Sequence, residues 1–169
     1  MSVTDILTWI HDSGVGTAVR ESDWMFPTLE SIHVVFLTAT FGSIILLDLR
    51  LTGLGFKGRS VSDVTKDVMV WTWVGFLGAA ITGTLLFTSN ALVYYNDFPT
   101  RGKFTCMGLA GINMLVYEFL MHPSISRWDN DVVPPSRVRV AGFISIVLWL
   151  GVIFFGRWIG FTTQDQNGG

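Results

Sequence analysis

Four long apolar runs constrain this 169-residue chain more than any other feature. They cover residues 28–51, 68–93, 104–121 and 138–161. A helix needs about 20 mostly apolar residues to cross the roughly 30 Å hydrocarbon core of a bilayer. Inside lipid each backbone amide must be paired within its own segment, so these runs are expected to be helices. The sequence therefore predicts an all-α membrane protein, a four-helix bundle that forms one domain over residues 1–169.

Composition supports the same class and excludes others. Hydrophobic residues make up 50% of the chain, which is more than an ordinary soluble domain carries, and charged residues only 14%. The net charge of −2 offers no basic surface for nucleic acid. The expected partner is therefore the lipid bilayer, and no nucleic acid is expected.

A short amphipathic segment precedes the first run. Ile6, Leu7, Trp9 and Ile10 would share one side of a helix. Such a helix suits the plane of the membrane surface. We therefore expect a short N-terminal interfacial helix before the four spans.

The distribution of Lys and Arg predicts the orientation, because positive charge collects in the short cytoplasmic loops. Seven of these residues flank the first and third connecting segments, and four lie on the other side. The seven are Arg50, Lys57, Arg59, Lys66, Arg127, Arg137 and Arg139, and the four are Arg20, Arg101, Lys103 and Arg157. This asymmetry predicts a multi-pass protein of the cytoplasmic membrane with both termini outside.

Small residues recur at four-residue spacing in two of the runs. Gly75, Ala79 and Gly83 do so in the second, and Gly156 and Gly160 in the fourth. Small side chains let membrane helices approach closely. The pattern favours tight helix contacts or a homo-oligomer seam, and alternatively a slot for a flat cofactor.

His33 is the ionisable residue that lies well inside an apolar run, between Ile32 and Val34. A histidine on an apolar face is most often a core residue with a hydrogen bond. A neutral imidazole is also the commonest metal and haem ligand, and bundle interiors hold such ligands. Both interpretations stay open from the sequence.

A haem held by His33 needs a second ligand at similar depth, and no other histidine provides it. His122 would lie at the opposite end of the bundle, on the order of 20 Å away at 1.5 Å per residue. His11 precedes the first span. The expected second ligand is therefore Lys103 or Met107, at the start of the third span.

The haem hypothesis also predicts partners for the propionates and the way in which the haem is attached. Arg101 and Arg157 lie at the same membrane edge and could pair with haem propionates. The chain has no Cys-x-x-Cys-His sequence for covalent attachment, so haem b is the expected form.

Several segments together carry a resemblance to a known family. They are Arg20-Glu21-Ser22, Trp24, Phe26-Pro27, Glu30, His33, Gly42, Asp48-Leu49-Arg50-Leu51, Trp71, Trp73, Thr82-Gly83, Phe98, Lys103, Ala110-Gly111 and Asn113. This pattern resembles the DUF6644 family of small bacterial four-span membrane proteins, which implies the bacterial inner membrane. In that family a histidine often stands where this chain has Glu118, and here the nearest histidine is His122, one turn later. The resemblance therefore assigns no role to a histidine on the inner side.

A second, weaker resemblance to a known family rests on His33 and Lys103. A first helix with a histidine before Gly42 and a closing Arg50-Leu51, followed by a lysine that opens the third helix, resembles the four-helix membrane protoporphyrinogen oxidases. That resemblance implies haem bound through His33 and Lys103.

Two functions therefore remain. One is a b-type haem protein that carries electrons between a quinone or redox partner and the outer face. The other is a cofactor-free four-helix accessory subunit of a membrane complex, in which His33 makes only a helix-to-helix hydrogen bond. The sequence has no phosphate loop, zinc spacing or nucleophile–base pair, so a kinase or hydrolase is not expected. Whether the chain is an enzyme stays open.

Overall fold

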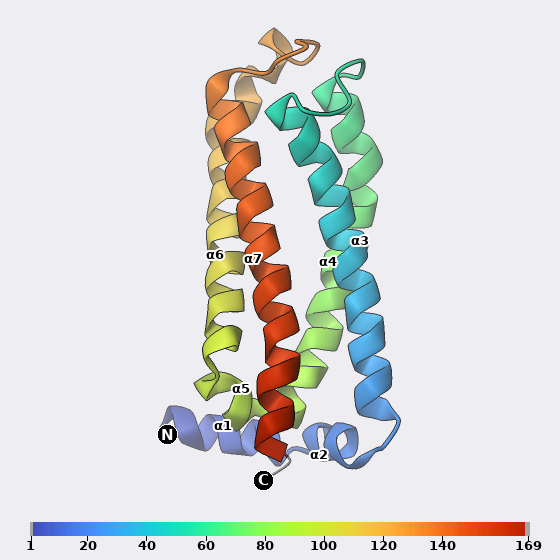
Figure 1. Cartoon of the computed structure of the whole chain (residues 1–169), viewed down its shortest axis with the longest axis vertical. Helices are drawn as coiled ribbons and strands as arrows, with labels where there is room; N and C mark the ends of the chain where they lie inside the picture. Colours follow the sequence, from blue (N-terminus) through green and yellow to red (C-terminus); the bar gives the residue numbers. More distant parts are fainter. Residues whose placement is uncertain (1, 168–169) are drawn as a thin grey trace.

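The computed structural model describes residues 2–167, and the side chains of residues 2–162. Four long apolar helices lie side by side and form an all-α bundle, as predicted (Figure 1). They are α3 (Met25–Thr52), α4 (Val61–Ser89), α6 (Phe98–Val116) and α7 (Ser136–Asn167). Both chain ends lie at one end of the bundle, called here the terminal end, and residues 53–60 and 128–135 form the opposite loop end (Figure 1).

Local signals place the turn between α3 and α4. Gly53 takes a left-handed conformation with φ +74° and ends α3, which glycine adopts without a steric penalty. The Gly55 amide then donates to the Leu49 carbonyl at 2.9 Å. Ser60 begins α4 by accepting a hydrogen bond from the Asp63 amide at 3.0 Å. The two helices are therefore joined by a short, hydrogen-bonded loop.

The second span ends earlier than its hydropathy suggests. The run over residues 68–93 was expected to be one helix, but α4 ends at Ser89 and Asn90 leaves helical geometry with φ −142°. A separate short helix, α5 (Ala91–Asn96), follows across the terminal end. Hydropathy does not register this break, because Ala91, Leu92 and Val93 at the start of α5 continue the apolar run.

The third span changes helix type near the loop end. After α6 come a π-helical turn η1 (Tyr117–Met121) and a 3₁₀ segment η2 (His122–Arg127). Pro123 explains the change, since proline lacks an amide proton and clashes with the carbonyl four residues earlier. On this turn His122 Nδ1 lies 3.4 Å from Glu118 Oε1, and both side chains are exposed.

Two N-terminal helices, rather than the single one expected, lie across the terminal end (Figure 1). They are α1 (Val3–His11) and α2 (Gly14–Glu21). Arg20 connects α2 to the bundle, because its Nη1 donates to the Ser89 carbonyl at 3.0 Å. Trp9 of α1 is 73% exposed, as suits a side chain at a membrane surface.

The bundle consists of two helix pairs. α3 packs along α4, α6 packs along α7, and α3 and α7 join the pairs. At the loop end Leu51, Val61, Trp128 and Val138 form a buried core. Most other large apolar side chains are exposed, which is expected where the surroundings are lipid.

Candidate cofactor site

A cavity of about 680 Å³ lies between the two helix pairs, toward the terminal end. It forms because α4 and α6 face each other here across open space, while α3 and α7 close its sides. Its polar lining includes His33 and Thr40 of α3, Thr100, Arg101 and Lys103 of α6, and Tyr94 and Tyr95 of α5. Its apolar lining includes Leu37, Phe76, Ala79, Phe87, Phe104, Met107 and Trp149.

His33 reaches the cavity with one ring nitrogen already engaged. Its Nδ1 lies 2.9 Å from Thr82 Oγ1. The Thr82 hydroxyl has one proton and a carbonyl acceptor, Gly78 O, at 2.7 Å. In the tautomer with its proton on Nδ1, His33 donates to Thr82 Oγ1, and Nε2 of the neutral ring keeps a lone pair. This is the arrangement that metal-binding histidines usually have, with the second nitrogen held by a neighbouring group. The Ala79 carbonyl is a second hydrogen-bond acceptor for the His33 ring.

Gly83 makes room for the imidazole. A Cβ at this position would lie 2.9 Å from His33 Cε1, closer than real Cβ atoms come to other heavy atoms. Thr82 thus provides the hydrogen bond to the His33 imidazole, and Gly83 provides the space that the imidazole occupies. Any larger residue at position 83 would push His33 away from Thr82.

Two cations face the cavity from α6. Lys103 is half-buried, and its charge acts electrostatically on His33 from the opposite wall. Arg101 holds the Tyr95 carbonyl through Nε at 3.0 Å, and its guanidinium lies 5.6 Å from the Tyr95 ring centroid. Neither cation has a carboxylate within ion-pair distance among residues 2–162. The lining therefore favours an anionic group near this end.

Tyr94 contributes a neutral phenol to the floor of the cavity. Burial raises the pKa of Tyr94 to about 12, and the nearby charges of Glu30 and Asp97 act in the same direction. Its hydroxyl therefore keeps its proton at physiological pH and is a hydrogen-bond donor.

The structure brings four of the five predicted site residues to one cavity. His33, Lys103, Met107 and Arg101 all line it. Arg157 does not, because its guanidinium lies over the Phe161 ring, 5.5 Å from the centroid. Arg157 is thus placed on α7 away from the lining.

Sequence reasoning missed several lining residues. Thr82 was noted as part of a family pattern but not as the partner of His33, although a threonine in an apolar span is itself a signal for a helix-to-helix hydrogen bond. Phe87, Phe104 and Trp149 gave no such signal, because aromatic residues in a span face lipid as often as a cavity.

Fold and cavity together define a class: a four-span α-helical membrane protein with a cofactor-sized cavity between its helix pairs. The chain matches the family described as "Family of unknown function (DUF6644)" over residues 6–162. It belongs to that family. No curated protein and no solved structure matches the chain, so the likeness to protoporphyrinogen oxidases gains no support from these comparisons.

Proposed function

We propose that the chain is a b-type haem protein that holds the haem in the cavity between the helix pairs, with His33 Nε2 as an axial ligand. The observation that carries the proposal is the 2.9 Å contact between His33 Nδ1 and Thr82 Oγ1, which orients the ring at the wall of the cavity. In the Nδ1–H tautomer this contact leaves Nε2 as the nitrogen that would bind iron. In this role Thr82 is a positioning residue, since it acts through His33.

The donor set of the cavity fits this cofactor. Its volume of about 680 Å³ lies within the range of roughly 300–1,000 Å³ that is usual for cofactor pockets. Apolar walls from Phe87, Phe104 and Trp149 suit the porphyrin faces and exclude water. Arg101 at the terminal end offers the cation that a propionate needs.

Lys103 and Met107 are the two candidates for the second axial position. Both line the cavity on α6. A lysine ligates iron only as the neutral amine, and a methionine through its thioether sulfur. The weaker family resemblance favours Lys103 of these two. When bound, the haem would supply one-electron redox chemistry, and a quinone or a redox partner protein would exchange the electron.

We further propose the bacterial cytoplasmic membrane as the location, with the terminal end outside. Four helices long and apolar enough to span place the chain in a membrane. The excess of Lys and Arg near the loop end supports a cytoplasmic position for residues 53–60 and 128–135.

The second candidate function is a cofactor-free accessory subunit. The observation in its favour is again the His33–Thr82 contact, which by itself joins α3 to α4 as a helix-to-helix hydrogen bond. In the haem protein His33 Nε2 binds the haem iron, whereas in the accessory subunit Nε2 binds no cofactor.

An absorption spectrum separates the two functions. The protein is expressed with ample haem, purified in mild detergent and measured before and after dithionite. We expect a reduced-minus-oxidised b-type band for the natural sequence. His33→Ala should abolish it, whereas His122→Ala, at the loop end, should leave it unchanged.

Thr82 provides a graded test of the same geometry. Thr82→Val removes the acceptor of His33 Nδ1–H and should lower haem affinity by about tenfold, the lower limit for the loss of such a supporting hydrogen bond. Thr82→Ser keeps the hydroxyl and should restore the affinity. A natural protein without any haem band supports the accessory subunit instead. A band lost in His122→Ala but kept in His33→Ala contradicts the site.

A further inference from the structure

A second hollow lies on the outer surface of the bundle, on the side of α3 and α4. It is a groove of about 330 Å³ whose floor and walls come from one face of each helix and from the loop that joins them. The lining residues are Thr38, Ala39, Gly42, Ser43, Leu46, Phe56, Arg59, Val64, Asp67, Val68 and Trp71. None of them lines the cofactor cavity.

The groove is apolar along most of its length and opens toward the surroundings of the bundle. Leu46, Phe56 and Trp71 border it with exposed apolar surface. A Cβ added at Gly42 would meet no heavy atom within 4 Å, so the absence of a side chain there keeps the groove open. In a membrane this space faces acyl chains.

Phe56 is held in an unusual conformation at one end of the groove. Its φ of +54° is left-handed, which is rare for a bulky residue and costs on the order of 1–3 kcal/mol. The Arg59 amide donates to the Phe56 carbonyl at 3.0 Å and closes the turn. The turn places an aromatic wall and the Arg59 side chain at the same end of the groove.

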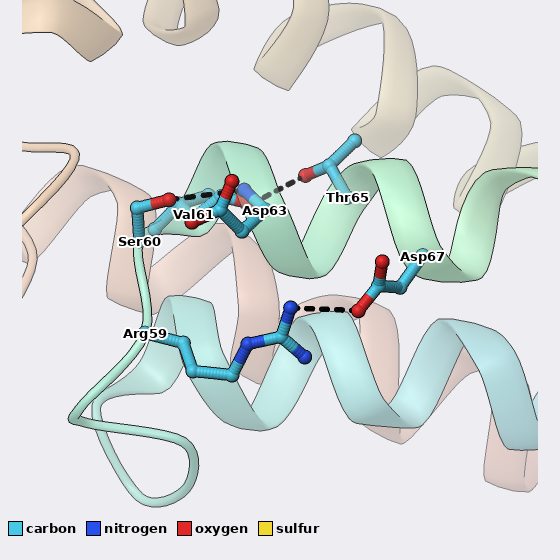
Figure 2. A network of polar contacts seen from close by, with 6 residues as sticks. All are labelled: Arg59, Ser60, Val61, Asp63, Thr65 and Asp67. Carbon is cyan, nitrogen blue, oxygen red and sulfur yellow. Dashed lines mark hydrogen bonds and ion pairs between the residues drawn. The ribbon is translucent and has the colours of Figure 1, made fainter.

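The polar end of the groove carries both charge signs. Arg59 Nη2 donates to Asp67 Oδ2 at 2.7 Å, and Figure 2 shows the second Asp67 oxygen pointing away from Arg59. Both side chains are about half exposed. Each partner therefore keeps capacity for a further contact: unused N–H donors on Arg59 and a free carboxylate oxygen on Asp67.

The length of α4 puts this charged end near the boundary between lipid headgroups and acyl chains. The 29 residues of α4 extend about 43 Å at 1.5 Å per residue, which exceeds the roughly 30 Å hydrocarbon core by about 6–7 Å at each end. Asp67 lies six residues after Val61, about 9 Å into the helix. The Arg59–Asp67 pair is therefore close to the boundary between headgroups and acyl chains.

We propose that this groove binds a phospholipid with a primary-amine zwitterionic headgroup, phosphatidylethanolamine, with one acyl chain lying along α3 and α4. The headgroup has the charges that the pair complements: its phosphate accepts from Arg59, and its ammonium donates to the free oxygen of Asp67. An anionic phosphatidylglycerol lacks the ammonium, and the quaternary ammonium of phosphatidylcholine cannot donate a hydrogen bond. This proposal does not depend on haem binding.

Native mass spectrometry of the full chain tests it. The protein in detergent is mixed with equal amounts of phosphatidylethanolamine, phosphatidylglycerol and phosphatidylcholine that share the same acyl chains. We expect one retained phosphatidylethanolamine per chain, favoured over the other two by about threefold, the size of effect that a solvent-exposed charge pair gives. Asp67→Asn should bring phosphatidylethanolamine and phosphatidylglycerol to equal occupancy.

Two leucine variants test the position of the lipid. Gly42→Leu fills the groove and should abolish the adduct, while Gly108→Leu, on α6 and equally free of neighbours within 4 Å, should keep it. Equal adducts in both variants overturn the proposed groove. Preference for phosphatidylglycerol in the natural chain, or displacement of the lipid by an added quinone, overturns the proposed ligand.

Discussion

Asp48 and Arg50 show how two charged residues at one helix end take different roles. Their spacing suggests an ion pair or phosphate contacts near the headgroups, but both side chains are buried, with exposed fractions of 4% and 0%. Arg50 donates to the carbonyls of Arg59, Asp129 and Asp131. Asp48 instead interacts with Ser145 of α7, and its Oδ2 is buried without a hydrogen-bond partner among the described residues. Asp48 and Arg50 therefore form no ion pair with each other among the described residues, and both are shielded from the surroundings of the bundle.

Because Arg50 holds both loops of the loop end, its loss should destabilise the whole bundle. Arg50→Gln removes the charge that three carbonyls accept from, and hydrogen bonds to charged groups contribute about 1.5–3 kcal/mol each. We expect a loss of about 2–4 kcal/mol, since the shorter glutamine amide and water recover part of this. Arg59→Gln, which breaks one exposed ion pair, should cost at most about 1 kcal/mol. Unfolding in detergent measures both, and equal midpoints contradict this role of Arg50.

At the scale of helices, the small residues explain which surfaces approach closely. In α4 the predicted positions do lie against α3, with Gly75 facing Thr40 and Gly83 facing His33. In α7 they do not: an added Cβ at Gly160 would have no neighbour within 4 Å, and one at Gly156 would meet only the Lys103 side chain at 3.9 Å. Gly108 and Gly111 of α6 are open in the same way. The α6–α7 contact uses other glycines: Gly102 against Phe155 and Gly151 against Cys106. Spacing alone could not distinguish these faces.

Gly75 and Gly108 therefore give opposite predictions for the same substitution. In Gly75→Ala the new Cβ would lie 2.7 Å from the Thr40 amide nitrogen and 3.0 Å from the Phe36 carbonyl oxygen. These are backbone atoms and cannot move aside, so α3 and α4 must separate, at a cost of about 1–3 kcal/mol. Gly108→Ala meets nothing and should be neutral or stabilising by up to about 1 kcal/mol. Thermal unfolding in detergent compares the two, and a tolerated Gly75→Ala contradicts the close contact.

For the whole molecule, the four spans could be predicted because lipid imposes length and apolarity on each span separately. The cavity could not, since it depends on α4 and α6 remaining apart, a property of pairs of helices that no single run reveals. His33 and Lys103 could be assigned to similar depth by counting residues along their helices. That Thr82 holds His33, and that Arg157 lies elsewhere, depends on helix rotation, which the sequence leaves open.

The orientation of the bundle in the membrane is fixed once the side of either end is known. Both termini lie at the terminal end, and four spans return the chain to the side where it began (Figure 1). Lys57, Arg59 and Arg137 keep the positive excess at the loop end. Alkaline phosphatase fused after residue 169 should therefore be active, and a fluorescent protein inserted at Gly58 should fluoresce. Gly58 suits the insertion because nothing lies within 4 Å of an added Cβ. The reverse result, an inactive phosphatase and a dark insertion beside a fluorescent C-terminal fusion, would place the terminal end and its cavity in the cytoplasm.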